Sequence, residues 1–124
     1  MNWYKSLVYK GDQLGRTIGF PTLNLDINVL TKHFDEGVYA CTVKIDDKNY
    51  QGMLYIGPRL VVGETKTVLE IHVFKFDEEI YGKEVEFEIG KYIRGIANFS
   101  SMDQMKQQLQ KDKKTILSLP NTTQ

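Results

Sequence analysis

A run of glycine, arginine and oxygen-bearing side chains between Gly11 and Asn24 is the part of this sequence best suited to chemistry. Gly11, Gly15 and Gly19 allow a ligand to approach the main chain closely, and the free N–H groups of such a loop form a concavity that suits phosphate. Arg16 adds a permanent positive charge inside the loop. Glycine-rich loops are more often simple turns, but this composition predicts a phosphate-binding loop.

The residues that follow the loop carry two candidate metal ligands. Pro21 fixes its own φ and favours an extended conformation at Phe20. Thr22 and Asn24 are two residues apart, which places both side chains on one face of an extended chain. A hydroxyl and an amide carbonyl are oxygen ligands that Mg²⁺ accepts beside nucleotide phosphates. We therefore predict that Thr22 and Asn24 bind the metal and that Thr22 also belongs to the phosphate site.

The loop is a near miss to the P-loop, and we exclude that motif. The spacing from Gly11 to Gly15 is one residue short, and Arg16 stands where the P-loop has lysine. A P-loop must also open a helix, which a proline at position 21 cannot continue.

Glu70 is a carboxylate inside an otherwise largely apolar segment, residues 67–76. Strand alternation puts Glu70 on one face with Val68, His72 and Phe74. Burying a carboxylate there without a partner is costly. Two interpretations follow: an edge strand that is partly wet on both faces, or a carboxylate with a function. His72 is more simply explained as a structural histidine.

The remaining pattern consists of short strands separated by tight turns. Alternating apolar and polar residues predict strands at residues 3–9, 37–45, 50–56, 67–76 and 85–89. Because no helix intervenes, we expect about six antiparallel strands that close into a small β-barrel.

A helix follows the strands, over residues 101–118. Ser101 and Gln104 predict a capping box at its start, and Pro120 ends it. A stripe of apolar residues at helical spacing predicts core packing, namely Met102, Met105, Leu109 and Ile116. We expect the tail, residues 120–124, to be frayed and residues 1–124 to form one domain.

Composition excludes several classes of protein. Lys plus Arg equals Asp plus Glu at 16 each, so the formal net charge is zero, which argues against nucleic acid as a partner. Cys41 is the single cysteine, which indicates a reducing, cytoplasmic setting. No stretch resembles a signal peptide or reaches the length of a membrane-spanning helix, so we expect no membrane association.

The pattern Gly-x-x-x-Gly-Arg-x-x-Gly-Phe-Pro-Thr-x-Asn resembles the signature of riboflavin kinases, with Leu23 where that family usually has alanine. The resemblance extends to almost the whole chain, since Glu70-x-His, Tyr81-Gly82 and the Arg94 region, with Asn98-Phe99-Ser100, also match. The chain is similar to the C-terminal kinase module of bacterial bifunctional riboflavin kinase/FAD synthetases. This resemblance implies a mainly β fold, a closed antiparallel Greek-key β-barrel with a C-terminal α-helix.

The resemblance also implies an activity. It implies transfer of the γ-phosphate of ATP to the 5′-hydroxyl of riboflavin, which gives FMN and ADP and requires Mg²⁺. Glu70 would be the catalytic base that takes the hydroxyl proton, and Arg94, Phe99 and Asp112 would contact the flavin. The expected partners are riboflavin or FMN and ATP or ADP, bound by a monomer.

A different class remains open, a flavin- or nucleotide-binding β-barrel without turnover that acts as a sensor or interaction module. It is kept open because residues 95–97 are Gly-Ile-Ala, where the family commonly has an acidic residue. The presence of Thr22, Asn24 and Glu70 together favours the enzyme, since binding alone does not need a base.

Overall fold

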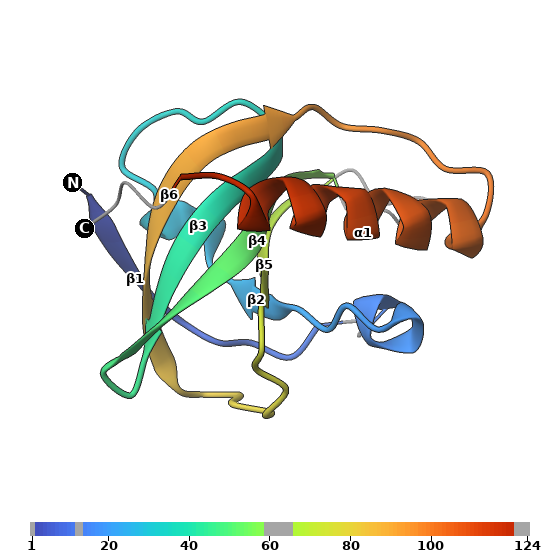
Figure 1. Ribbon diagram of the computed structural model, residues 1–124. Coiled ribbons are helices and arrows are strands. Elements are labelled where there is room, and N and C mark those ends of the chain that lie inside the picture. The colour runs from blue at the N-terminus through green and yellow to red at the C-terminus, as the bar shows by residue number, and fades with distance from the viewer. Residues whose placement is uncertain (1, 12–13, 59–65, 121–124) are drawn as a thin grey trace.

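The structure is a computed structural model that describes residues 2–11, 14–58 and 66–120. Strands make up most of it, with one long helix at the end (Figure 1). The elements are β1 (Trp3–Leu7), the 3₁₀ helix η1 (Leu14–Ile18), β2 (Leu23–Leu25), the 3₁₀ helix η2 (Ile27–Val29), β3 (Gly37–Ile45), β4 (Lys48–Pro58), β5 (Thr67–Val73), β6 (Glu84–Arg94) and α1 (Met102–Leu117).

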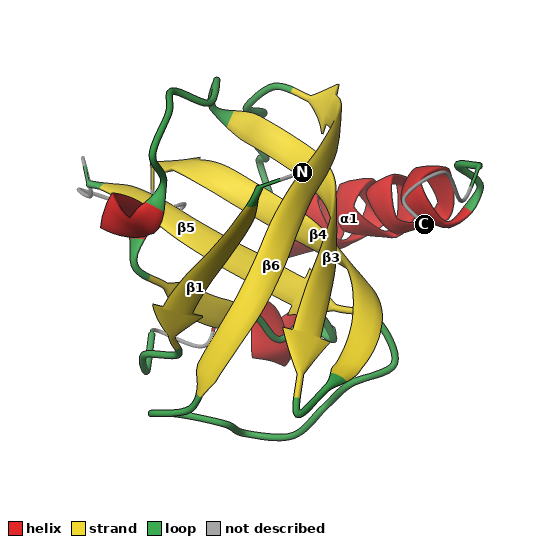
Figure 2. Ribbon diagram, turned by 90° about the vertical axis from the view of Figure 1, so that its left-hand side faces the viewer, coloured by secondary structure: helices red, strands yellow, loops and turns green. Residues whose placement is uncertain are grey.

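The strands form one antiparallel sheet in the order β1-β6-β3-β4-β5-β2. Figure 2 shows that the sheet is strongly curled, so that its two edge strands approach each other. Among the described residues, the segment just after β1 is joined to β2 by a single bridge, in which Tyr9 N–H donates to the Asn24 carbonyl at 2.8 Å. The six antiparallel strands agree with the sequence prediction, but a continuous ladder that would close the barrel is not seen in the described part of the chain.

The β3–β4 hairpin shows how local sequence sets the register. Asp46 and Asp47 adopt positive φ angles of 51° and 66°, as both central residues of a tight two-residue turn must. Aspartate tolerates this conformation better than most residues. The turn pairs Ile45 with Lys48 and sets the register of the whole hairpin.

The interior of the curled sheet holds the main hydrophobic core. Alternate residues of every strand point into it, as period-2 patterning requires. The most deeply buried members have exposed fractions of 0–1%, namely Val43, Leu54, Leu69, Ile71, Val85 and Phe87.

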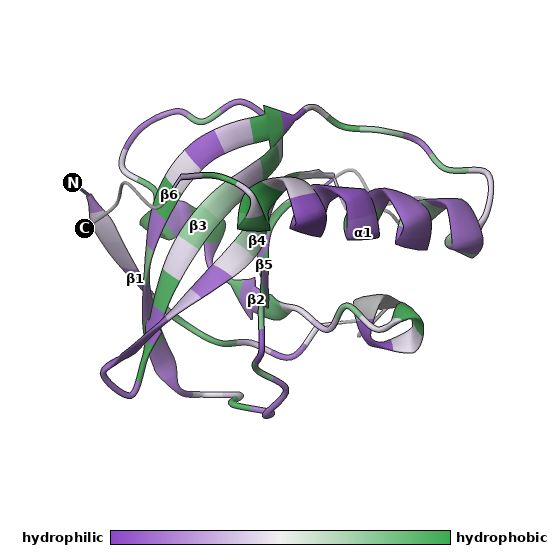
Figure 3. Cartoon of the chain, viewed as in Figure 1, coloured by the Kyte–Doolittle hydropathy of each residue, from purple (hydrophilic) through white to green (hydrophobic). Residues whose placement is uncertain are grey.

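A second, smaller cluster lies on the outer face of the sheet, beneath α1. Its buried members come from β3, β4, α1 and the segments that flank β2 and β5, namely Phe20, Val38, Met53, Phe74 and Ile116. Figure 3 shows the opposite side of α1 as hydrophilic, so the helix is amphipathic and covers this outer face.

The helix begins where the sequence predicts, although two details differ. Ser101 accepts the Gln104 N–H at 3.2 Å, but the Gln104 side chain reaches back to Ser100, not to Ser101. Met105 and Ile116 are buried, whereas Met102, the first residue of α1, is 39% exposed. The predicted fraying at 121–124 concerns residues outside the described part of the chain. No helix in the described ranges has both the length and the apolar character needed to cross a membrane.

Candidate active site

Thr22, Asn24 and Glu70 lie close together where β2 pairs with β5. Asn24 and Glu70 are register partners in this pairing. The Thr22 hydroxyl donates to Glu70 Oε1 at 3.3 Å. Because β5 lies between β4 and β2, the edge-strand interpretation of Glu70 is wrong. Instead, Glu70 is half-buried, with the Thr22 hydroxyl as a hydrogen-bond partner and Asn24 as its register partner on β2.

Asn24 is held in place by the start of the glycine loop. Its carbonyl accepts the Tyr9 N–H, and its side chain lies against the Gly11 main chain. A β-carbon added at Gly11 would lie 2.2 Å from Asn24 Nδ2 and 2.6 Å from its Oδ1. Glycine is therefore required at this position by the close approach of the amide.

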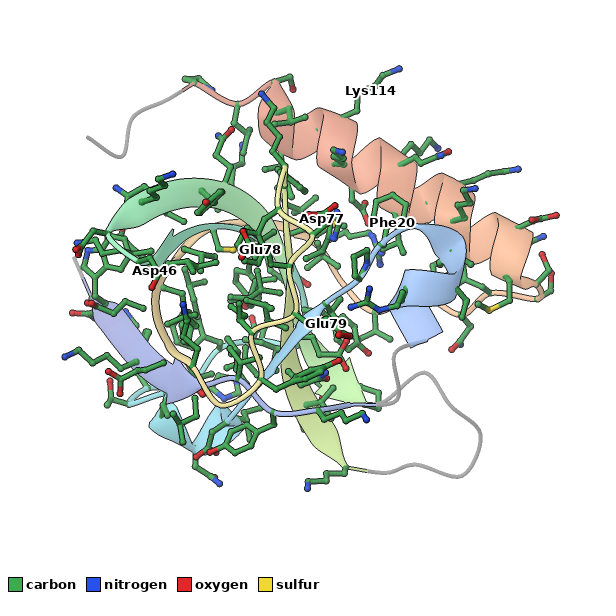
Figure 4. The ribbon with its side chains drawn as sticks, turned by 90° about the horizontal axis from the view of Figure 1, so that it is seen from below. Phe20, Asp46, Asp77, Glu78, Glu79 and Lys114 are labelled. Carbon is green, nitrogen blue, oxygen red and sulfur yellow. The ribbon has the colours of Figure 1, made fainter. Side chains whose placement is uncertain are left out.

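His72 attaches the turn before β2 to β5. Its Nδ1–H donates to the Pro21 carbonyl at 2.8 Å, and its ring makes edge contacts with Phe20 and Phe74. Burial lowers the pKa of His72, with a further lowering by the nearby Lys113, although the bond to Pro21 acts in the opposite direction. In Figure 4, Phe20 lies where this turn passes α1. The structural role that the sequence suggested for His72 is consistent with these contacts.

The rest of the glycine loop differs from a simple turn. Gly15 and Arg16 belong to η1, a 3₁₀ helix that the sequence analysis did not predict. Gly19 has a φ of +85°, which favours glycine at the end of η1. Arg16 lies 3.7 Å from Glu79, in a pair whose side chains are 43% and 57% exposed. Exposed pairs contribute only about 0–1 kcal/mol, so Arg16 can exchange Glu79 for a phosphate at little cost.

Two hollows flank the Thr22–Asn24 segment. One contains Arg16, Thr22 and the acidic connection between β5 and β6, whose Asp77, Glu78 and Glu79 are labelled in Figure 4. The other contains Asn24 together with Lys10 and Lys66. Local sequence does not single out these lysines, because Lys66 is 56 positions from Lys10 and only the fold brings them to one hollow.

The expected flavin residues Arg94 and Asp112 bind each other. Arg94 Nε lies 3.0 Å from both carboxylate oxygens, and Nη2 lies 2.8 Å from Oδ2. Gln108 donates to Oδ1 at 3.0 Å, and the Asp112 side chain is only 3% exposed. This bidentate ion pair joins the end of β6 to α1. Phe99 is half-buried in the connection between these two elements.

The donor set of the candidate site suits a magnesium–nucleotide complex. Thr22 and Asn24, the two predicted metal ligands, each offer an oxygen atom, and the close Gly11–Asn24 packing gives the amide a defined position. The described residues contain no group of three or more His, Cys, Asp or Glu side chains able to hold a metal ion. Two neutral oxygen ligands fit a metal that is bound jointly by the protein and by a ligand's phosphates.

A model of the riboflavin kinase family, Flavokinase, matches residues 3–119. The chain belongs to this family. A similar curated protein is the trifunctional protein RibF/MnmA of Mycoplasmoides gallisepticum, 39% identical over 94% of this chain and 18% of its own length. Another is the bifunctional riboflavin kinase/FMN adenylyltransferase of Haemophilus influenzae, 36% identical over 93% of this chain and 37% of its own length. The chain thus spans well under half of these relatives.

Solved structures support the fold of this riboflavin kinase family member. A Streptococcus pneumoniae structure described as a macrolide-efflux protein matches with a TM-score of 0.84 and 30% identity, over 95% of this chain and 39% of its own. Riboflavin kinase from Trypanosoma brucei matches with a TM-score of 0.56 at 22% identity, over 94% and 80% of the two chains. This second likeness concerns the fold alone.

One relative bears on the expected partners. The RNA-binding riboflavin kinase RibR of Bacillus subtilis is 36% identical over 85% of this chain and 45% of its own length. A family member named for RNA binding means that the neutral charge of this chain does not exclude nucleic acid. The absence of a nucleic-acid partner therefore stays a prediction.

Proposed function

We propose that this chain is an ATP:riboflavin 5′-phosphotransferase that forms FMN and ADP. The observation that carries the proposal is the contact between Thr22 and Glu70 beside Asn24, in a member of the riboflavin kinase family. It joins a candidate base to one candidate metal ligand and places the second beside it in the strand register, and transfer of a phosphoryl group to a hydroxyl requires a base near the metal.

The proposed roles follow from the positions of the side chains. Thr22 and Asn24 would hold Mg²⁺, which, when bound, neutralises charge on the nucleotide phosphates. Glu70 orients the 5′-hydroxyl and accepts its proton as the new O–P bond forms and the bond from the γ-phosphorus to ADP breaks. Gly11, Gly15, Arg16 and Gly19 are proposed to hold the phosphates.

Lysines from the neighbouring hollow extend this phosphate site. Lys10 and Lys66 line the same hollow as Asn24, so their charges are placed to stabilise a polyphosphate that reaches the metal ligands. Arg94, Phe99 and Asp112 are proposed to form the flavin end. There the Arg94–Asp112 pair would act by fixing the guanidinium and α1 at the edge of the flavin site.

The proposal also covers the domain organisation, barrel closure, oligomeric state and cellular location of the protein. We infer one domain over residues 1–124, a barrel closed through the Tyr9–Asn24 bridge, and a monomer working in the cytoplasm. Cys41 is buried, and burial raises the pKa of its thiol, which makes it a poor partner for disulfide exchange. The alternative of a barrel that binds flavin or nucleotide without turnover is not favoured, because it leaves the Thr22–Glu70 contact without a purpose.

The deciding experiment incubates the protein with riboflavin, ATP and Mg²⁺ and separates FMN from riboflavin by chromatography. We expect FMN and ADP in equal amounts, and none when EDTA removes the metal. Glu70→Gln is the control for a contaminating kinase, since a contaminant would be unaffected. Riboflavin binding without FMN formation would support the non-catalytic alternative.

A further inference from the structure

One row of register partners crosses five strands and links both ends of the candidate site. Arg94 on β6 pairs with Val38 on β3, and Val38 pairs with Tyr55 on β4. Tyr55 pairs with Glu70 on β5, and Glu70 pairs with Asn24 on β2. Val38 and Tyr55 therefore lie between the candidate flavin end and the candidate base, and Tyr55 is the one next to Glu70.

The length of this row is informative. Arg94 and Glu70 are separated by three strand spacings, which amounts to about 14 Å along the sheet at about 4.8 Å per spacing. Asn24 is only one spacing beyond Glu70, at about 5 Å. A substrate that has a flat ring at the Arg94 end and a hydroxyl at Glu70 must therefore extend across β3 and β4, where Val38 and the larger Tyr55 lie.

Tyr55 faces the same side of the sheet as the candidate site. It is half-buried and packs against the outer cluster beneath α1, which also contains Phe20 and Phe74. Its neighbours in β4, Leu54 and Ile56, point instead into the main core. The Tyr55 ring is thus part of the wall on which a ligand between α1 and the sheet would rest.

The absence of a side chain at Gly57 makes room for the hydroxyl end of the Tyr55 ring. A β-carbon added at Gly57 would lie 2.9 Å from the Tyr55 hydroxyl oxygen and 2.6 Å from Ile96 Cδ1. The Tyr55 hydroxyl donates to the Pro58 carbonyl, which fixes the orientation of the ring. Tyr55 and Ile96 therefore meet over Gly57, and the ring is held by its tip as well as by its packing.

The surroundings of Tyr55 keep its phenol protonated. Burial raises the pKa of Tyr55 to about 12, with smaller contributions from Glu70 and Glu36, while Arg94 acts to lower it. The phenol is neutral at any working pH, so it cannot act as a second base. It can provide an apolar face and a fixed edge.

We propose that Tyr55 is a specificity-determining residue, whose ring supports the polyol chain of a flavin between Arg94 and Glu70 and thereby determines which hydroxyl reaches Glu70. This inference rests on the proposed function. It predicts selectivity for the length of the polyol chain, because this chain must span the distance over the Tyr55 ring from the flat ring system to Glu70. A flavin whose polyol chain is one carbon shorter would place its terminal hydroxyl short of Glu70.

The test compares riboflavin with a flavin whose polyol chain is one carbon shorter, using wild type, Tyr55→Ala and Tyr55→Phe. For Tyr55→Ala we expect the KM for riboflavin to rise at least about tenfold, the loss corresponding to one aromatic contact and its buried area. We also expect the preference for riboflavin over the shorter flavin, in kcat/KM, to fall by a similar factor. Tyr55→Phe keeps the ring and should recover most of both losses.

Two controls separate this role from a structural one. Tyr50→Ala makes the same truncation in the same strand, at a position that packs against Phe76 and lies outside the row; it should leave both the KM and the preference unchanged. Mg²⁺-dependent ADP affinity, measured by calorimetry, should be unchanged in Tyr55→Ala. If Tyr55→Ala does not fold, Tyr55→Leu keeps the bulk without the flat ring, and the same rise in KM is expected.

The outcomes are distinct. An unchanged KM and an unchanged preference in a folded Tyr55→Ala or Tyr55→Leu would overturn the inference. So would a Tyr55→Phe variant as impaired as Tyr55→Ala, because the Pro58 contact would then be what matters. If wild type forms no FMN, the proposed function fails, and the inference is judged by riboflavin binding alone, which Tyr55→Ala must still weaken.

Discussion

The Asn24 side chain lies directly against the main chain of Gly11, so the first glycine of the loop positions a candidate metal ligand. The two residues are 13 positions apart in the sequence, and the Tyr9–Asn24 bridge holds them together. Because Gly11 has no side chain, it leaves room for the Asn24 amide, and in this way it can influence the candidate metal site without contacting a ligand itself.

Gly11→Ala tests this relationship. The new β-carbon must displace the Asn24 amide, so we expect Mg²⁺-dependent ADP affinity to fall about 10–100-fold, the range typical when a group that orients a metal ligand is lost. Asn24→Ala should have a similar effect, and the double variant should add little to it. Calorimetry with and without Mg²⁺ measures both. Gly90→Ala, where the β-carbon would lie 3.1 Å from the Ala40 carbonyl, is the matched control glycine outside the site. Normal affinity in Gly11→Ala would contradict the assignment.

Glu70→Gln tests the catalytic base. The substitution keeps the shape and an acceptor for the Thr22 hydroxyl, but it removes the proton acceptor. Positioned bases contribute about 10²–10⁴-fold, so single-turnover FMN formation should slow by that factor while riboflavin and ADP affinities change far less. A thermal melt of the same sample reports the folded fraction. Near-normal turnover per folded molecule would remove Glu70 from the mechanism.

Asp112→Ala tests the ion pair that joins β6 to α1. The variant leaves the Arg94 guanidinium, whose side chain is only 20% exposed, without its carboxylate. Removing one partner of a buried pair costs about 3–5 kcal/mol, which should appear in urea unfolding at pH 7. The double variant Arg94→Met/Asp112→Leu should recover much of that stability, because two apolar side chains replace the pair. It should still lose riboflavin affinity if Arg94 belongs to the flavin end. Full stability in Asp112→Ala would show that the pair does not hold α1.

Stability should also depend on pH through His72. Burial lowers the pKa of His72 in the folded state below its ordinary value of 6.5. As the pH falls below about 6.5, the unfolded chain binds a proton before the folded chain does, so the stabilisation present above that pH is progressively lost. His72→Asn keeps a donor for the Pro21 carbonyl and cannot titrate. The difference in the free energy of unfolding between pH 7.5 and 5.5 should therefore be larger in wild type than in the variant, and an equal difference would disprove the effect.

Much of the secondary structure could be predicted from local sequence. The five strands expected from alternation correspond to β1, β3, β4, β5 and β6, and the cap at Ser101 opens α1. These features depend on side-chain periodicity and on turn chemistry within a few residues. The spacing of Thr22 and Asn24, the suitability of a Gly-rich loop for phosphate and the family resemblance are likewise properties of short stretches.

The arrangement of the site was decided by the tertiary structure. Thr22 contacts Glu70 across 48 positions, His72 bonds Pro21 across 51, and Arg94 binds Asp112 across 18. None of these partners can be read from local pattern, because register and helix docking are set by which apolar faces pack together. The sequence by itself therefore determined which residues could do the chemistry. Only the curled sheet, with η1 and α1 on its outer face, decided which of them meet and placed Tyr55 between Glu70 and Arg94, because strand pairing is what joins residues that are distant in the chain.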